Sequence, residues 1–559
     1  HNRLMEKILL GAKSMTNADG GTLYLVTDKK DGLKFEIMLN DTLDVAMGGT
    51  TGKPIPFPPL RLHDDAGVPN HKNVSSYCAL SGTTVNIADA YDVDKFDFSG
   101  TKAFDAKTGY RSKSFLTVPL KNYENEVIGV LQLINARDRK NNVVAFGPDI
   151  TPLIEALASQ AAVALDNSRL IEAQKNLFKS FIQVIAGSID AKSPYTGGHC
   201  NRVPTITFML AKAACESTDG PFKDFMLTED EWYELEVSAG LHDCGKVTTP
   251  EYIVDKATKL ETIYNRIHEV RMRFEVLKRD AVIDYLQGVV AGERAEPELK
   301  AEMEARLAQL DDDFAFIAEC NVGGEFMAPE RVERMKQIAE ITWVRTLDDH
   351  LGLSIDEMRR RRGDEPKPPV VEKLLDDKEW HIIPHEVPVD LSQYDAEGFS
   401  MRPCANKYNL GVGRGTLTAE DRFKINEHIT QTILMLKALP FPKNLTRVAE
   451  WAGGHHEKMD GTGYPKGLKR EDMSAPARMM AVADIFEALT AADRPYKKPK
   501  TLSESLKIMS FMVKDRHIDP ELWELFLRSG VWKTYAEQYL RPEQIDDVDI
   551  TNYLPKPAA

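Results

Sequence analysis

Short stretches of alternating apolar and polar residues dominate the first part of the chain. Four of them, 21–26, 33–38, 114–120 and 127–134, read as strands joined in pairs by polar turns. A period of two with Gly, Asn and Asp at the turns is typical of antiparallel hairpins. Helix-like stretches flank these hairpins. We therefore expect residues 1–150 to form an α+β module, an antiparallel sheet covered by helices.

Residues 150–182 carry a heptad pattern instead, in which only Ser168 and Lys175 interrupt an apolar seam. The seam consists of Ile150, Ile154, Leu157, Ala161, Ala164, Ser168, Ile171, Lys175, Phe178 and Ile182. Such spacing is typical of a two-stranded coiled coil. We therefore expect residues 151–186 to form a linker helix that pairs with a second copy of the chain in a parallel homodimer. The alternative is a long helix that packs on its own domain.

Two further helical patterns follow, at 260–281 and 303–317, with a charged loop at 292–297 between them. Two such helices joined by a polar loop predict an antiparallel helical hairpin. From 351 to 408 the sequence is Pro-rich and irregular. The basic run Arg359–Arg362 in this stretch is expected to be a solvated helix end rather than a contact for an acidic partner.

Composition limits the classes of function. The chain has 559 residues, with 71 Lys and Arg against 86 Asp and Glu and a formal net charge of −15, which argues against a broad nucleic-acid-binding surface. No apolar run approaches the ~18 residues of a membrane span, so we expect no membrane segment in this chain. The six cysteines are scattered and form no C-x-x-C pair, which argues against a disulfide scaffold. The sequence therefore favours the reducing cytoplasm as the compartment. The sequence begins inside an expected helix, so we expect further residues upstream.

Four polar pieces in otherwise apolar helices carry the candidate chemistry. They are His199 in 195–203, the run from His242-Asp243 to Lys246, the run from His455-His456 to Pro465, and Asp484 with the following Asp493–Tyr496. Burying adjacent His-Asp and His-His pairs is unfavourable unless something compensates them. A divalent metal does so, because imidazole and carboxylate are its preferred ligands. Each piece alone favours the alternative, because a lone His-Asp pair is more often a structural hydrogen bond and a lone His on an apolar helix is usually a core residue. The combination therefore carries the inference.

The first 150 residues resemble a GAF sensory domain, in the order of 86–91, 108–111 and the later strands. The GAF domains of cyclic-nucleotide phosphodiesterases carry a signature of Asn-Lys, then Phe, then Asp-Glu. This chain matches it in part, with Asn135, Phe146 and Asp149. The resemblance leaves two roles open, namely a small regulatory ligand bound in the GAF domain or dimerisation alone.

The four polar pieces resemble the HD-GYP domain, a subgroup of the HD-type metal phosphohydrolases. His-Asp-x-Gly-Lys and His-His-Glu-x-x-Asp-Gly-x-Gly-Tyr-Pro occur here in the family's order. The resemblance implies an all-α catalytic domain in two parts, 187–258 and 409–535, followed by a tail at 536–559. A long helical insertion at 259–408 interrupts it, and we expect this insertion to act as a lid or a partner-docking arm.

The resemblance also implies a site for two divalent metal ions. His199, His242, Asp243 and Asp484 would bind one, and His428, His455 and His456 would bind the other, with Asp243 bridging both. The family places a histidine eleven residues after the Leu of a Gly-x-Leu-Thr turn. That spacing selects His428, after Leu417, over His268. Tyr195 stands where trinuclear relatives have Glu, which favours two metals, and a mixed His and carboxylate set favours iron or manganese over zinc.

Further residues are implied to contact the substrate. Lys246 would face the scissile phosphate as a positive charge, and with Asp243 it forms the implied catalytic pair. The implied substrate-binding residues are Lys246, Gly463, Tyr464, Pro465, Lys466 and Lys469. The glycines of this turn would permit close approach to a ligand and Pro465 would fix the turn, whereas surface solubility is the alternative for the two lysines. Glu487 and Cys244 depart from the family pattern and are not expected to be ligands.

These resemblances together predict a GAF-regulated, metal-dependent phosphodiesterase of a cyclic dinucleotide, with cyclic di-GMP cleaved to pGpG and on to GMP. One alternative is a signalling module of weak activity that binds a cyclic dinucleotide or a protein partner. Oxygen chemistry at a dinuclear iron site is another, and Lys246 and the Gly-Tyr-Pro motif disfavour it. The GAF ligand and the choice between cyclic di-GMP and a hybrid dinucleotide stay open.

Overall fold

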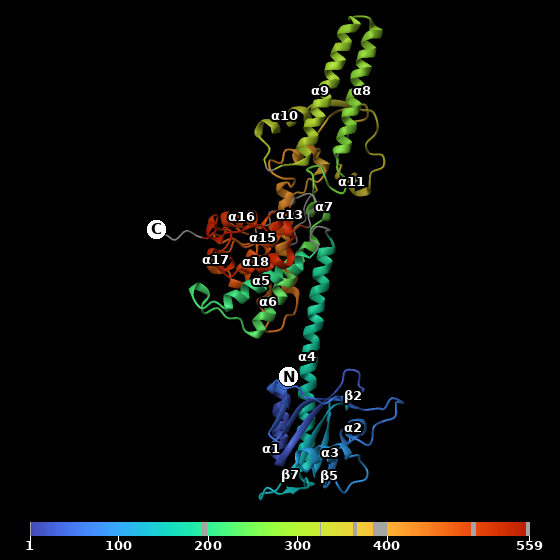
Figure 1. The fold of residues 1–559 in the computed structure, drawn as a ribbon. Helices are drawn as coiled ribbons and strands as arrows, with labels where there is room; N and C mark the ends of the chain where they lie inside the picture. The colour runs from blue at the N-terminus through green and yellow to red at the C-terminus, as the bar shows by residue number, and fades with distance from the viewer. Residues whose placement is uncertain are drawn as a thin grey trace. The chain divides into compact units, whose positions relative to one another are not determined.

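A computed structural model gives the fold. It describes residues 2–192, 198–324, 326–361, 366–383, 400–492 and 499–554. The chain divides into two compact units, His1–Phe178 and Lys179–Ala559 (Figure 1). The expected α+β class is confirmed. The first unit is a sheet covered by helices, and the regular elements of the second unit are helices apart from one pair of short strands. Tyr195, Arg362 and Asp493–Tyr496 lie outside the described residues.

The first unit is built on an antiparallel sheet with strand order β3-β2-β1-β7-β6-β5, and short strands β4 and β8 pair with β2 and β7. The strands are β1 (Ala18–Val26), β2 (Gly32–Asn40), β3 (Val45–Gly48), β4 (Leu60–Arg61), β5 (Val85–Ile87), β6 (Phe115–Lys121), β7 (Val127–Arg137) and β8 (Val143–Val144). The four strands expected from the alternating pattern are β1, β2, β6 and β7, the centre of the sheet. The remaining strands are too short for alternation to reveal them.

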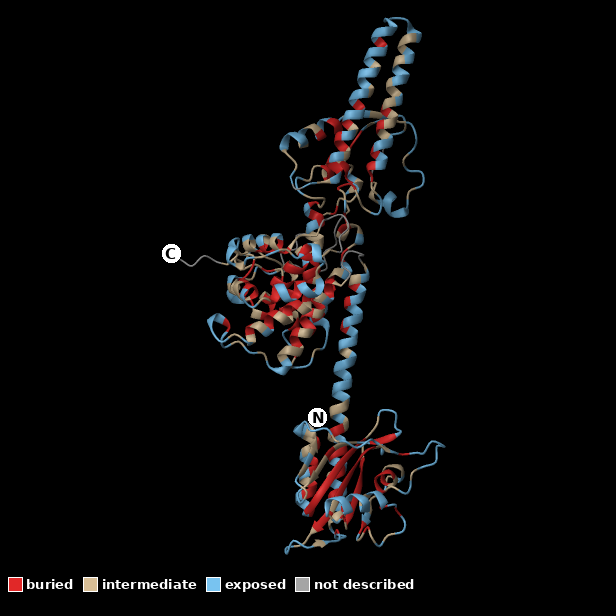
Figure 2. Ribbon diagram, viewed as in Figure 1, coloured by how far each residue is buried: buried red, intermediate tan, exposed pale blue. Residues whose placement is uncertain are grey.

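Helices cover this sheet because successive side chains of a strand point to opposite faces. Leu23 and Leu131 pack with α1 (Asn2–Thr16) and the first part of α4 (Ile150–Lys192). On the other face Tyr24 packs near α2 (Val74–Ser81), and α3 (Ser99–Thr108) lies between β5 and β6 in the chain. The central strands are accordingly buried along most of their length (Figure 2).

The helix α4 is 43 residues long. Ile154, Ala161 and Leu165 of this helix are buried in the core of the first unit, so the first part of the predicted coiled-coil seam packs on its own domain, as the alternative had it. Farther along, several large apolar side chains of α4 are exposed in the single chain: Leu170, Ile171, Leu177, Phe181, Val184 and Ile185. Leu153 and Val163 are exposed on the first part of α4, but most of the exposed apolar side chains that a helix partner would meet lie on the later part. Neither α4 nor any other helix in the described part of the chain has the apolar length needed to cross a membrane.

Among the described residues of the second unit, two hydrophobic cores stand out. Leu210, Phe486 and Trp523 mark the first, and Phe274, Leu310 and Met335 mark the second, which belongs to the insertion. The helices are α5 (His199–Cys215), α6 (Glu229–Leu241), α7 (Glu251–Val254), α8 (Ile267–Ala291), α9 (Glu296–Val322), α10 (Pro329–Ala339), α11 (Ile355–Arg360), α12 (Asn406–Leu410), α13 (Ala419–Ala438), α14 (Val448–Gly453), α15 (Ala475–Thr490), α16 (Leu502–Lys514), α17 (Pro520–Arg528) and α18 (Val531–Tyr539). The insertion thus has a core of its own.

The helices α8 and α9 lie side by side in this insertion (Figure 1). The expected helix start at Leu260 is wrong, because α8 begins at Ile267. Leu260 is buried as a loop residue whose N–H donates to Asn321 Oδ1 at 2.8 Å, and Ile263 is exposed. The stretch expected to be irregular contributes β10 (Val370–Lys373), which pairs with β9 (Thr342–Arg345). Local pattern did not reveal this pair because its partners are distant in the sequence.

Buried lysines join the points where the chain enters and leaves the insertion. Lys256 Nζ donates to Asp421 Oδ2 at 2.7 Å, and both side chains are buried. Lys259 Nζ donates to the carbonyl oxygens of Leu410 and Val412 at 3.0 and 2.7 Å. These contacts fasten the segment after α7 to α12 and to the start of α13.

Replacing Lys256 by Ala should lower the free energy of unfolding of the second unit by about 3 kcal/mol, because it leaves the Asp421 carboxylate buried without its cation. Urea unfolding followed by circular dichroism measures the loss. Arg528→Ala, which removes the more exposed Arg528–Glu524 pair, is the control and should cost no more than about 0.5 kcal/mol. Equal losses for the two variants would contradict the role of this clamp.

Candidate metal centre

Five histidines and two aspartates of the second unit come together at one place. His199 opens α5, His242 and Asp243 follow α6, His428 lies within α13, His455 and His456 follow α14, and Asp484 lies within α15. They form two groups whose ligand atoms lie within 4.8 Å of one another: His199, His242, Asp243 and Asp484, and Asp243, His428, His455 and His456. All seven residues expected from the sequence are therefore neighbours, whereas His268 is exposed on α8.

Asp243 belongs to both groups, and each of its carboxylate oxygens faces one of them. Oδ2 lies 3.1 Å from His199 Nε2 and 3.2 Å from His242 Nε2. Oδ1 lies 3.2 Å from His428 Nε2 and 3.9 Å from His455 Nε2. This is the arrangement of a carboxylate that can bridge two cations.

Backbone carbonyls orient three of the imidazole rings in the same way. His242 Nδ1 lies 2.8 Å from the carbonyl oxygen of Ala239, and His455 Nδ1 lies 2.6 Å from that of Ala452. His428 Nδ1 makes the same contact with the carbonyl of Ile425. A carbonyl oxygen only accepts, so Nδ1 carries the proton and Nε2 keeps its lone pair. Each ring therefore presents an electron pair to the centre, as metal-binding histidines do.

The centre contains buried polar atoms without hydrogen-bond partners among the described residues. They are Nε2 of His242, His428 and His455, and Oδ1 of Asp243. Leaving such atoms unpaired in a protein interior costs about 1–3 kcal/mol each, and native structures rarely gather several in one place. A cation bound among them would satisfy all of these atoms, so the residues present fit a metal site.

The charges of the centre suit the same purpose. Burial would raise the pKa of Asp243, but Lys246 and His242 outweigh it and hold that pKa well below its usual value. Burial and His242 lower the pKa of His455 to about 4, and burial and His455 likewise lower the pKa of His456. At neutral pH His455 and His456 are therefore neutral imidazoles beside the Asp243 carboxylate, the protonation states that bind metals.

Glu487 has a role that sequence reasoning missed. Its Oε2 lies 2.5 Å from His199 Nδ1, and its Oε1 accepts a hydrogen bond from Arg202 Nε at 2.7 Å. The carboxylate is buried and orients His199 as the carbonyls orient the other rings. Its place on α15 one turn after Asp484 could have suggested this contact.

Two of the expected substrate residues lie at the centre. Lys246 Nζ is 2.6 Å from Asp243 Oδ2, so a positive charge lies beside the bridging carboxylate. The Tyr464 ring stacks on His456, with ring centroids 4.9 Å apart and an interplanar angle of 18°. Pro465 follows directly in this turn.

The close approach that the structure shows at Gly463 is to the chain itself. A Cβ at this position would lie 2.3 Å from the backbone N of Lys458 and 2.4 Å from Cα of Glu457. The buried Glu457 carboxylate accepts the N–H groups of Lys466 and Leu468 at 2.8 and 3.0 Å. The motif thus folds its own loop. Lys466 and Lys469 are exposed on that loop, outside the cluster.

A second glycine joins the His-Asp motif to α13. A Cβ on Gly245 would lie 1.9 Å from the carbonyl oxygen of His428, and the Gly245 N–H donates to Thr432 Oγ1 at 2.9 Å. Glycine permits this approach. The close contact of Gly245 with α13 brings His428 next to Asp243.

The end of α4 reaches the same loop. Lys192 Nζ donates to the carbonyl oxygens of Lys246 and Val247, at 3.3 and 2.5 Å. Ile182 of α4 packs against Gly240 of α6, where a Cβ would come within 2.7 Å of it. The last turns of α4 therefore contact the segment that carries His242 and Lys246.

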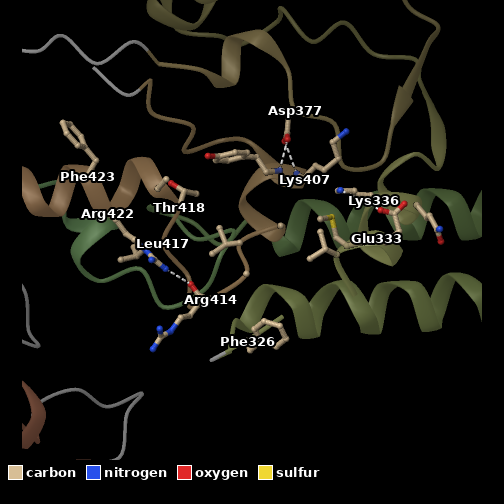
Figure 3. Close-up of a pocket in the computed structure, with 18 of the residues that line it drawn as sticks. Phe326, Glu333, Lys336, Asp377, Lys407, Arg414, Leu417, Thr418, Arg422 and Phe423 are labelled. Carbon is tan, nitrogen blue, oxygen red and sulfur yellow. Dashed lines mark hydrogen bonds and ion pairs between the residues drawn. The ribbon is translucent and has the colours of Figure 1, made fainter. Parts of the chain in front are cut away.

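A cavity of about 1210 Å³ lies away from the centre, between α10 and the start of α13 (Figure 3). Lys336 and Glu333 line its α10 side, and Arg414 and Leu417 line the side toward α13. None of the seven clustered residues lines it. Its volume alone does not make it the site of chemistry, because the clustered histidines and aspartates lie elsewhere.

Family comparisons agree with this architecture. Residues 2–165 match the model of the GAF domain, and residues 404–522 match a model of the HD domain. The chain carries a GAF domain and an HD domain. The HD match includes His428, His455, His456 and Asp484, whereas His199, His242 and Asp243 lie before it in the sequence.

Curated relatives match shorter stretches. A 3'3'-cGAMP-specific phosphodiesterase 1 of Vibrio cholerae is 36% identical over 116 residues, 21% of this chain and 26% of the relative. A cyclic di-GMP phosphodiesterase of Pseudomonas aeruginosa is 44% identical over 83 residues, 15% and 19% of the two chains. A cyclic di-GMP phosphodiesterase of Thermotoga maritima is 35% identical over 132 residues, 24% and 34%. The matches thus span between about a fifth and a third of these relatives.

The cluster predicts how metal binding responds to loss of single histidines. His428→Ala should remove about one metal ion per chain and lower the melting temperature of the metal-loaded protein, because one of the two ligand groups loses a ligand. Elemental analysis and thermal unfolding with and without EDTA measure both effects. His268→Ala, on the exposed face of α8, is the matched control and should leave both unchanged. Full metal content in His428→Ala would contradict its place in the site.

Proposed function

We propose that the chain is a metal-dependent phosphodiesterase that hydrolyses a cyclic dinucleotide, with cyclic di-GMP cleaved to linear pGpG and on to GMP. The observation that carries the proposal is the bridging position of Asp243, whose two oxygens face two sets of imidazole nitrogens. The printed activities of the curated relatives support the substrate class. Two divalent ions, iron or manganese, would occupy the two groups.

Bound at this place, the ions would supply Lewis-acid activation of a phosphate ester and of water. The protein contributes the rest. The carbonyls of Ala239, Ile425 and Ala452 and the Glu487 carboxylate hold the imidazole rings in one orientation. Lys246 adds a positive charge at the edge of the cluster, suited to the phosphate of the substrate. Tyr464, stacked on His456, gives a flat wall against which a base can pack.

We place regulation in the GAF domain. A cavity of about 600 Å³ lies in this unit, with Tyr24, Phe35 and Phe115 as aromatic walls and Gln132 and Thr22 as polar groups. Its volume and mixed lining suit a small organic ligand. The helix α4 starts on this domain and ends at the Lys246 loop, so it offers a covalent route for the signal.

We also propose that the exposed later part of α4 pairs with a second copy. Leu170, Leu177 and Phe181 are more than half exposed in the single chain, and an apolar stripe on a long helix is typical of a coiled-coil seam. All six cysteines are free, and most are buried, which supports a reducing cytoplasm as the compartment.

Turnover of cyclic di-GMP by the full chain, with metal content measured on the same sample, tests the activity. Asp243→Asn should lower kcat at least about 100-fold, because it removes the charge shared by both groups. Asp224→Asn, at an exposed position of the same unit, is the control and should retain the wild-type rate. Full turnover in Asp243→Asn would contradict the assigned residue. A fully metallated protein that binds cyclic di-GMP without cleaving it or 3'3'-cGAMP would favour the signalling-module alternative.

Lys192 is proposed as a positioning residue for the Lys246 loop. Lys192→Ala should lower kcat between about 3- and 10-fold with KM little changed, because the loop is then free to shift by a fraction of an ångström. Lys192→Arg retains a donor and should restore most of the rate. The control is Lys179→Ala, at an earlier position of α4, which removes an ion pair with Glu236 of α6. A KM effect alone, or no rescue by Arg, would argue against positioning.

A further inference from the structure

A cavity of about 650 Å³ lies within the insertion, apart from the metal centre. The start of α8, the β9–β10 pair and residues 376–381 form its walls. We propose that this cavity binds an anionic ligand that carries a planar ring, a mononucleotide by chemical class. The proposal is independent of the phosphodiesterase activity.

The lining of the cavity is unusually basic for this chain. Six Lys and Arg side chains line it against four Asp and Glu, although the whole chain carries a net charge of −15. Among the described residues, two of the four acidic side chains are each shared between two cations, and Lys373 pairs with Glu340 outside the lining. Glu372 accepts from Arg345 Nε at 2.6 Å and from Lys378 Nζ at 3.1 Å, and Asp349 lies 2.7 Å from Arg361 and 3.2 Å from Arg345. Positive charge therefore remains in excess.

Two arginines of α8 supply part of that excess. Arg271 Nη1 lies 2.6 Å from His268 Nδ1, and Arg273 Nη1 donates to the carbonyl oxygen of Leu374 at 2.8 Å. Within the described residues, no carboxylate forms an ion pair with either. Guanidinium groups held in this way retain donors for phosphate oxygens.

His381, also in the lining, reports the same positive environment. Burial, together with the charges of Arg266, Lys378 and Arg273, lowers its pKa to about 4. The imidazole thus stays neutral among these cations at physiological pH. An anion that enters the cavity would meet an unbalanced positive field from several sides.

Aromatic rings complete the site. Trp343, Trp380 and Tyr264 line the cavity, and the cations of Arg361 and Lys378 lie 4.5 and 5.3 Å from the centroid of the Trp380 ring. Aromatic faces beside Arg and Lys are the chemistry that stacks a base and holds its phosphate.

The volume sets the size of the ligand. Small-molecule sites typically measure about 300–1,000 Å³, so 650 Å³ suits one nucleoside with its phosphate. A bare phosphate would leave the tryptophans uncontacted, and a free nucleoside would leave the arginines without their anion. A whole mononucleotide would contact both the tryptophans, through its base, and the arginines, through its phosphate.

Calorimetric titration of the full chain with AMP tests the proposal, with phosphate and adenosine as the separate halves. AMP should bind at one site per chain, in EDTA as well as with metal, because none of the seven clustered residues lines this cavity. AMP should bind at least about tenfold more tightly than phosphate or adenosine, since one base stack contributes about 1–3 kcal/mol. Its affinity should fall as salt is added.

Variants locate the site. Arg271→Gln and Trp380→Leu should each weaken AMP binding at least about tenfold, whereas Arg279→Gln, on the same helix but paired with Glu275, should not. Circular dichroism checks that each variant folds. Absence of AMP binding to wild type, or binding unchanged in both variants, would overturn the proposal. Phosphate that binds as tightly as AMP would overturn the role of the rings, and an oligonucleotide that binds more than tenfold tighter would overturn the small-molecule class.

Discussion

The second unit depends on one buried carboxylate, that of Asp243. A charge of this kind is stable in a protein interior only when cations or donors surround it. Lys246 provides one partner at 2.6 Å, yet Oδ1 has no hydrogen bond among the described residues and faces His428 and His455. The ends of α6 and α14 and the middle of α13 are brought together around this group. The fold therefore concentrates unsatisfied polar atoms where two cations would satisfy them.

The sequence predicted the members of this cluster better than the contacts that orient them. Residue type and spacing identified His428 over His268, and the structure places the first in the cluster and the second on an exposed surface. The carbonyls that orient the rings were not predictable, because they depend on which helix ends meet in space. For Gly463 the pattern indicated close approach, but only the fold shows that the approach is to Glu457 and Lys458.

The same limit applies to the GAF domain. Its four central strands were predictable because each is long enough to show a period of two, whereas the edge strands are not. The partial ligand signature also has a packing explanation. Asn135 has φ 58°, and its Oδ1 accepts from the N–H groups of Lys113 and Ser114, while Phe146 is buried in the core. These residues hold the sheet together, so the case for a ligand rests on the cavity lined by Tyr24 and Gln132.

A short non-helical segment, 411–418, and the helix α13 join the insertion to the candidate metal centre. Lys256 and Lys259 fasten its two ends together, and the chain leaves it directly into α13, which carries His428. The contact between Gly245 and the His428 carbonyl leaves no space for a methyl group, and close-packed interiors transmit small displacements. A shift of α13 along its axis would therefore move His428 against the loop of Asp243 and Lys246.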